Sequence, residues 1–158
     1  MVVHPAPRMG AQWRRRTDRS LDVKLLNNRL AGACASLAGA NGAFAIAAAA
    51  YGRHDLADAY PREIVSIAAN LQLAHAVALL GLAALAELTD SRWASTLGLA
   101  ATSFALGTIL FSGTLYVLGL YGVLLLEGAA PAGGLFLIVG WLVIAFMGLR
   151  SLMSPPAR

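Results

Sequence analysis

Four long apolar runs, separated by short polar or charged segments, dominate the sequence. They cover about residues 30–50, 64–86, 95–119 and 132–149. A helix needs roughly 17–25 apolar residues to cross the hydrocarbon core of a bilayer, so each run can span a membrane. The pattern therefore predicts an all-α fold, an integral membrane four-helix bundle.

Charged residues divide the chain into three predicted parts. These are a basic cytoplasmic or juxtamembrane segment (1–29), a domain of four transmembrane helices (30–150) and a short C-terminal tail (151–158). Only 13% of the residues are charged and 58% are hydrophobic. Soluble domains carry about 25% charged residues, so this composition excludes an ordinary soluble domain.

The distribution of basic residues predicts how the spans are oriented. Seven of the twelve Lys and Arg residues precede the first apolar run, and basic residues beside a span mark the cytoplasmic side. With both termini in the cytoplasm, only Arg53 and Arg62 face the opposite side. We therefore expect cytoplasmic termini, and contact with anionic lipid headgroups rather than nucleic acid. The residues expected to set topology and touch headgroups are Arg14, Arg15, Arg16, Arg19, Lys24 and Arg29.

The N-terminal segment has two interpretations. Residues 13–26 could lie along the cytoplasmic headgroups with their few apolar side chains dipping inward. Alternatively, the segment is a solvated tail that only sets topology. A cleaved signal peptide is disfavoured because the first apolar run exceeds the usual length of about 7–15 residues for the apolar region of such a peptide.

Small residues recur along the first run. Gly32, Ser36, Gly39 and Ala43 are spaced by four, three and four residues, which places them on one helical face. In a membrane, such faces let two helix backbones approach closely and gain van der Waals contact.

Polar residues within the spans are few and fall at similar depths. The polar content of the uncharged stretch 93–126 is confined to hydroxyls, among them Thr102, Ser103, Thr108, Ser112, Thr114 and Tyr116. Polar groups at mid-membrane depth should face the bundle interior and find partners there. Matching depths across the predicted topology gives a hydrogen-bonded layer that links all four helices. Its predicted members are Asn41, Gln72, His75, Thr108, Ser112 and Trp141.

The polar layer has two interpretations, a structural network or a pathway for protons or small solutes. The sequence contains no cysteine pair, phosphate-binding glycine loop or zinc-protease motif, so we expect no enzyme activity, metal site or cofactor. His54 and His75 differ too much in depth to ligate one haem. The acidic residues Asp55, Asp58 and Glu63 are interpreted as a solvated loop.

Several motifs resemble one known family. Residues 106–116 (LGTILFSGTLY) resemble the signature of the YgdD/YwdK-type small inner-membrane proteins, a family of unknown function. Residues 72–80 (QLAHAVALL) resemble its second span, and 49–54 (AAYGRH) resemble the end of its first. Residues 130–134 (APAGG), followed by Gly140 and Trp141, resemble its fourth span. The chain departs from the pattern at Ala49, at Asn70 and in its long basic N-terminus.

The resemblance covers about residues 30–149 in order. It implies a four-helix protein of the bacterial cell inner (plasma) membrane and no known reaction. Our leading hypothesis is a non-catalytic accessory, assembly or structural subunit, with membrane lipids and other integral membrane proteins as partners. The alternative is a small-solute or proton conduit through the polar layer around Gln72 and His75.

Overall fold

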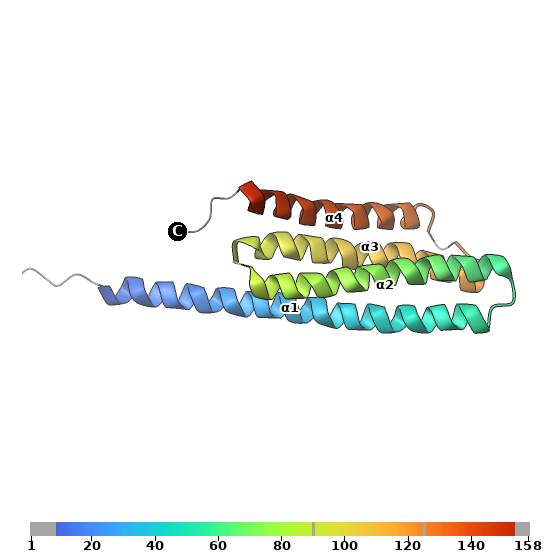
Figure 1. Ribbon diagram of the computed structural model, residues 1–158, viewed down its shortest axis with the longest axis horizontal. Coiled ribbons are helices and arrows are strands. Elements are labelled where there is room, and N and C mark those ends of the chain that lie inside the picture. Colours follow the sequence, from blue (N-terminus) through green and yellow to red (C-terminus); the bar gives the residue numbers. More distant parts are fainter. Residues whose placement is uncertain (1–8, 90, 125, 154–158) are drawn as a thin grey trace, which may run out of the picture.

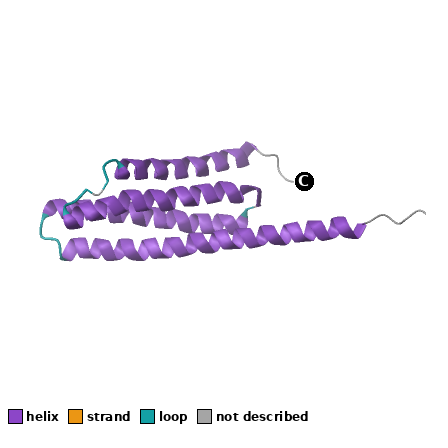
Figure 2. Cartoon of the chain, turned by 180° about the vertical axis from the view of Figure 1, so that it is seen from behind, coloured by secondary structure: helices purple, strands orange, loops and turns teal. Residues whose placement is uncertain are grey.

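The computed structural model describes residues 9–89, 91–124 and 126–153, with side chains from Lys24 onward except that of Ser91. Regular structure in these ranges is entirely helical. The helices are α1 (Met9–His54), α2 (Ala59–Leu88), the short 3-10 helix η1 (Ser91–Trp93), α3 (Ala94–Tyr121) and α4 (Ala129–Met153). Each predicted apolar run lies within one long helix, and short loops connect them (Figure 2).

Helix ends follow the local sequence. Pro61 and Pro131 lie in the first turns of α2 and α4, where a missing backbone N–H breaks no intrahelical hydrogen bond. The α3 helix ends at Gly122, whose φ of 68° is the left-handed conformation that glycine adopts readily. The Gly122 N–H donates to the Leu118 carbonyl at 2.9 Å and closes the last turn.

The helices pack in chain order. α1 packs on α2, α2 on α3, and α3 on α4, with a smaller contact between α1 and α3. Both ribbon views place α1 and α4 at opposite edges, with α2 and α3 between them (Figures 1 and 2). The largest buried side chains belong to the two central helices, Phe104 to α3 and Leu79 and Leu82 to α2. The two central helices therefore hold most of the core.

Glycines bring α3 and α4 close together. A Cβ on Gly133 would lie 2.4 Å from the Phe111 amide nitrogen, and one on Gly107 would lie 2.9 Å from the Gly133 carbonyl oxygen. A Cβ on Gly140 would lie 2.5 Å from the Phe104 ring. Only glycine permits this close approach of the two backbones.

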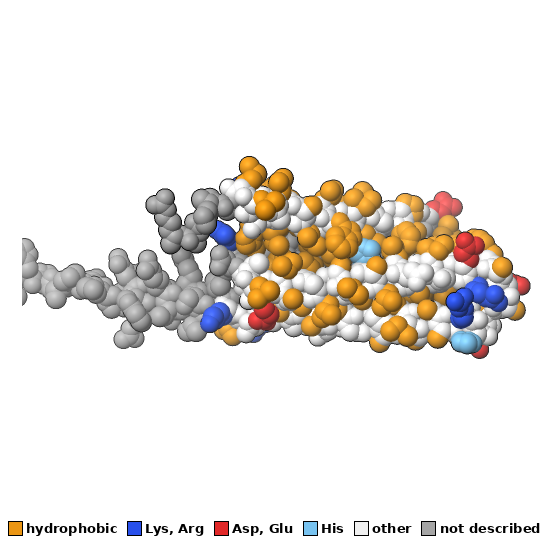
Figure 3. Space-filling view, in the orientation of Figure 1, with side chains coloured by type: hydrophobic (Ala, Val, Ile, Leu, Met, Phe, Trp, Pro, Cys, Tyr) orange, Lys and Arg blue, Asp and Glu red, His pale blue; other side chains and the backbone are white. Residues whose placement is uncertain are grey.

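The outer surface is apolar along its sides and charged at its ends (Figure 3). Large side chains such as Ile109, Val77 and Leu142 are each more than 60% exposed. All four long helices contain stretches long and apolar enough to cross a membrane. An exposed surface of this kind suits hydrocarbon and not water. For the described residues, the prediction of an all-α fold with four helices long and apolar enough to span a membrane is confirmed.

The helix α1 is much longer than the first apolar run. It contains 46 residues, which corresponds to about 69 Å at 1.5 Å per residue. Asn27 donates to the carbonyl oxygen of Thr89 at the end of α2 (3.3 Å), so the residues before Asn27 extend past the bundle (Figure 1). The predicted N-terminal segment and first span thus share one uninterrupted helix from Met9. The side chains of Arg14, Arg15, Arg16 and Arg19 lie outside those described.

Candidate functional site

Gln72 connects three helices through its side-chain amide. It lies on α2 and is 8% exposed. Its Nε2 donates to Asn41 Oδ1 on α1 at 3.0 Å, and its Oε1 accepts from the Tyr116 hydroxyl on α3 at 2.7 Å. Asn41 in turn donates to the Leu37 carbonyl at 2.8 Å. Partners on both sides therefore fix the orientation of the amide.

His75 connects α2 to α4. Trp141 Nε1 donates to His75 Nε2 at 3.2 Å, and His75 Nδ1 lies 2.8 Å from the Leu71 carbonyl oxygen. An indole N–H can only donate, and a carbonyl oxygen can only accept. These contacts require the neutral tautomer with its proton on Nδ1, so both ring nitrogens are engaged.

An aromatic cluster surrounds this histidine. The centroid of the His75 ring lies 5.3 Å from that of Phe104 and 6.1 Å from that of Trp141, with edge-to-face geometry. The Phe104 and Trp141 centroids are 5.2 Å apart. Separations of this size are typical of favourable aromatic pairs. The His75–Trp141 hydrogen bond is thus held in a largely apolar environment.

The two predicted hydroxyls behave differently. Ser112 on α3 donates to the Ala68 carbonyl on α2 at 3.0 Å. Thr108 donates to the Phe104 carbonyl of its own helix at 2.7 Å and joins no neighbour through that bond. A hydroxyl within a helix commonly bonds the carbonyl four residues earlier. Ser112 therefore takes part in the interhelical network, whereas Thr108 does not.

Apart from the Ser112 bond to the Ala68 carbonyl, the observed layer has two parts that share α2. One contains Asn41, Gln72 and Tyr116, and the other contains His75 and Trp141. None of the hydrogen bonds described above joins Gln72 to His75 directly. Buried side-chain nitrogen and oxygen atoms in the described part of the chain all have partners. Each fully buried nitrogen and oxygen atom of the layer thus has at least one hydrogen-bond partner.

Two positions differ from the sequence interpretation. Trp141 is 50% exposed instead of facing the interior, because α4 is an edge helix and only one face of it packs. Tyr116 was missing from the predicted layer, although it is 7% exposed and bonds Gln72. The sequence did contain a signal for Tyr116: it is one of the hydroxyl residues of this stretch and lies one helical turn after Ser112. The depths were compared at the backbone, and the long Tyr116 side chain places its hydroxyl at a different depth from its own Cα, next to Gln72.

Four surface pockets have described linings, and Gln72 and His75 line none of them. Among the described residues, no group of three His, Cys, Asp or Glu side chains is placed to hold a metal ion. Asp55, Asp58 and Glu63 are exposed around the α1–α2 loop. Arg62 stabilises that loop by donating to the Leu56 and Ala57 carbonyls.

These features define a small multi-pass membrane protein whose interior polar groups bond to one another. The chain belongs to the family described as "Protein of unknown function (DUF423)", whose model matches residues 48–134. The predicted resemblance to the YgdD-type family is confirmed by the relatives described next.

Three relatives illustrate the match. A "UPF0382 membrane protein" of Staphylococcus epidermidis is 32% identical over 115 residues, which cover 70% of this chain and 89% of the relative. A "UPF0382 membrane protein" of Haemophilus influenzae is 29% identical over 119 residues, 73% of this chain and 93% of the relative. The "UPF0382 inner membrane protein YgdD" of Escherichia coli is 32% identical over 108 residues, which cover 66% of this chain and 80% of the relative. No solved structure matches the chain.

Proposed function

We propose that this protein is a non-catalytic accessory or assembly subunit that packs sideways against larger integral proteins of the bacterial cytoplasmic membrane. The observation that carries the proposal is the small-residue face of α1, formed by Gly32, Ser36, Gly39 and Ala43. All four residues are exposed. Among the described residues, a Cβ at Gly32 or Gly39 would meet no side chain and no other helix within 4 Å.

The contrast with the α3–α4 contact supports this assignment. There, glycines lie against a neighbouring helix at distances that exclude a Cβ. On α1, comparable residues face outward, where they can form the same kind of contact with another protein. Since apolar area alone drives no association in lipid, close backbone packing is what such a face offers a partner.

A conduit through the polar layer has less support. His75 is 5% exposed, and both of its ring nitrogens have partners. A proton or solute pathway needs groups that exchange partners with water in a connected cavity. The four described pockets do not include His75 in their linings.

The lateral contact is testable with Gly39→Leu. Because a Cβ there has open space, the variant should fold as the wild type does. We expect membrane proteins that co-purify with the wild type in mild detergent to be lost from Gly39→Leu. Gly148→Leu, an exposed position on α4 with equally open space, is the matched control and should retain them. A monomer in every mild detergent, or cross-linking of this face only to a second copy, would contradict the proposal.

We also propose that both termini face the cytoplasm. Among the described residues, Lys24, Arg29, Arg92 and Arg150 belong to one end of the bundle, and Arg53 and Arg62 to the other. A surplus of basic residues favours the cytoplasmic side.

Cysteine labelling tests this orientation. Cys34, the single natural cysteine, is buried. We expect Asp58→Cys to react with a membrane-impermeant maleimide in spheroplasts, and Ser151→Cys to react only after permeabilisation. The reverse pattern would overturn the assignment.

A further inference from the structure

A polar pocket lies between α1 and α2, at the end of the bundle that carries the α1–α2 loop. Its volume is about 270 Å³. The lining consists of two arginines, two uncharged polar residues and two small residues, namely Arg53, Arg62, Ser66, Asn70, Ala49 and Gly52. The arginines lie near the loop, and the uncharged polar residues lie farther along α2. Hydrogen-bonding side chains are therefore present on an outer face of the bundle.

Ser66 and Asn70 are polar residues on the outside of a helix that is apolar enough to span a membrane. Both are exposed. Asn70 Nδ2 lies 3.5 Å from Ser66 Oγ, which is a long and weak hydrogen bond. Polar groups within a span normally face the bundle interior or a partner that bonds them. These two side chains therefore suit a hydrogen-bond acceptor that reaches them from outside the chain.

Arg53 and Arg62 add guanidinium N–H groups at the loop end of the pocket. Arg62 donates through Nε and Nη2 to the Leu56 and Ala57 carbonyls. These bonds fix its guanidinium, and Nη1 keeps two further N–H donors. Within the described part of the chain, Arg53 forms no hydrogen bond or ion pair. Since guanidinium groups bind phosphate through paired hydrogen bonds, a phosphate suits the loop end of the pocket.

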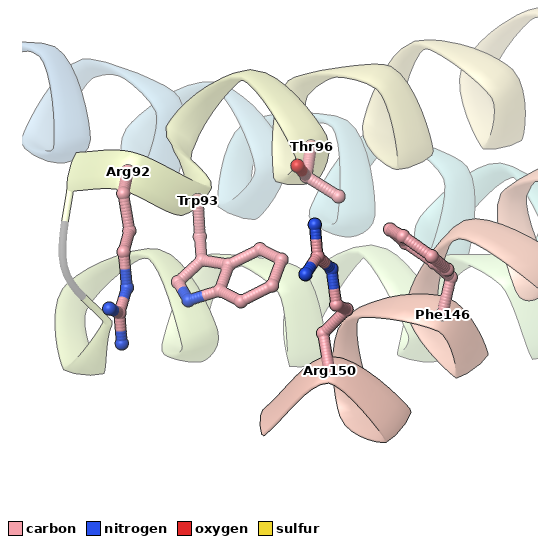
Figure 4. Close-up of a pocket in the computed structure, with 5 residues that line it drawn as sticks. All are labelled: Arg92, Trp93, Thr96, Phe146 and Arg150. Carbon is pink, nitrogen blue, oxygen red and sulfur yellow. The ribbon is translucent and has the colours of Figure 1, made fainter. Parts of the chain in front are cut away.

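The polar pocket at the opposite end of the bundle differs in this respect. It is lined by Arg92, Trp93, Thr96, Phe146 and Arg150 (Figure 4). Both arginines interact within the chain. The Arg92 guanidinium carbon lies 5.9 Å from the Trp93 ring centroid, and that of Arg150 lies 5.7 Å from the Phe146 centroid. The α1–α2 pocket is therefore the better candidate for a ligand.

Carboxylates lie around the same loop as the two arginines of the α1–α2 pocket. Asp55, Asp58 and Glu63 are exposed, and Figure 3 shows positive and negative side chains gathered at this end, on the right of the view. Three carboxylates against two guanidinium groups disfavour a ligand with net negative charge. A ligand that carries both a phosphate and an ammonium group can pair with both kinds of side chain.

We propose that the α1–α2 pocket binds one phospholipid of the phosphatidylethanolamine class, a zwitterionic lipid with a primary ammonium group. Arg53 and Nη1 of Arg62 hold its phosphate, and the loop carboxylates accept hydrogen bonds from its ammonium. Ser66 and Asn70 donate to its ester carbonyls. From Arg62 to Ser66, α2 rises about 6 Å, and one headgroup region of a bilayer is roughly 5–8 Å deep. The polar side chains thus follow the order of polar groups in a phospholipid.

The first test compares lipid binding to the full-length protein by native mass spectrometry from detergent. Phosphatidylethanolamine should bind more tightly than phosphatidylglycerol, which is anionic, or phosphatidylcholine, whose ammonium has no N–H. Arg53→Gln should weaken this binding at least about tenfold, the loss expected for a hydrogen bond between charged groups. Arg29→Gln removes the same charge at the opposite end and should leave the affinity unchanged. Equal affinities for the three lipids, or equal losses in the two variants, would overturn the proposal.

The second test fills the pocket without changing a charge. Ala49 lines the pocket, whereas its exposed neighbour Ala50 lines none of the four described pockets. Ala49→Trp should abolish the preference for phosphatidylethanolamine, and Ala50→Trp should retain it. Wild-type binding by Ala49→Trp would contradict the proposal. Should Ala49→Trp fail to fold, Asn70→Leu removes one donor and should weaken binding about fivefold. An unchanged affinity of that variant would equally contradict the proposal.

The third test addresses the ammonium group and the source of the phosphate. Asp55→Asn/Asp58→Asn/Glu63→Gln removes the loop carboxylates and should shift the preference from phosphatidylethanolamine toward phosphatidylglycerol. An unchanged preference would overturn the assignment of a zwitterionic ligand. Soluble phosphoethanolamine and inorganic phosphate should not displace the lipid at equal concentration, because they lack the ester carbonyls and acyl chains. Displacement by either compound would indicate a site for a soluble phosphate and overturn the assignment of a lipid.

Discussion

Replacing Gly133 with leucine should separate α4 from α3 and lower the free energy of unfolding by about 3 kcal/mol, the upper part of the range for overpacked sites. Any side chain at this position must displace backbone atoms. The nearest are the Phe111 amide nitrogen, 2.4 Å from an added Cβ, and the Gly107 carbonyl oxygen, 2.9 Å away. Backbone within a helix cannot move aside as a flexible side chain can, so the two helices must move apart.

The measurement is unfolding by sodium dodecyl sulfate in dodecyl maltoside micelles, followed in a background where Trp141 is the only tryptophan. Helix content from circular dichroism should remain, because the helices persist in micelles, while Trp141 emission should report loss of its contact with His75. Gly148→Leu changes the same helix at a position with open space and should unfold as the wild type does. Identical curves for Gly133→Leu and Gly148→Leu would show that the close α3–α4 contact is absent.

Replacing Gln72 with leucine should lower the free energy of unfolding by about 2 kcal/mol, within the range for a buried hydrogen-bonding group left without its partner. The amide bonds Asn41 on one helix and Tyr116 on another. Its loss leaves the buried Tyr116 hydroxyl without its acceptor. In membranes single hydrogen bonds contribute less, about 0.6 kcal/mol on average, so most of the effect should come from this buried hydroxyl.

Two further variants separate these contributions. Asn70→Leu alters another amide of α2 that is exposed and forms only a 3.5 Å contact with Ser66, so it should have little effect. Gln72→Leu/Tyr116→Phe removes the stranded hydroxyl and should regain part of the lost stability. The same detergent titration measures all three. An additive result for the double variant would contradict a direct Gln72–Tyr116 interaction.

The apolar runs predicted the helices well because membrane thickness sets the length of a span. Depth was equally predictable, since helix rise is constant at about 1.5 Å per residue. Matching depths placed Asn41, His75 and Trp141 near the midplane, with Gln72 slightly outward, and did not say which of them bond. In the structure, Gln72 bonds Asn41 and Trp141 bonds His75. The rotation of each helix about its own axis was harder to predict from the sequence, because it depends on which helices pack beside it. The sequence therefore could not indicate that half of Trp141 would face outward.

The spacing of residues along a helix also does not determine which acceptor a hydroxyl will bond. Thr108 and Ser112 are four residues apart, yet one bonds its own helix and the other bonds α2. The continuity of α1 was missed because residues 9–29 lack the apolar pattern that identified the spans. Nothing in that basic segment interrupts a helix, and the absence of Pro between Met9 and Leu30 is the signal that could have indicated it.

The uninterrupted α1 helix gives the protein a mechanical property. From Met9 to Asn27 the helix extends about 27 Å beyond the end of α2. A helix resists bending and twisting. A tilt or rotation of the first span in the bilayer would therefore also move the end of α1 near Met9. A molecule attached near Met9 would therefore be displaced by a change in the tilt of the first span.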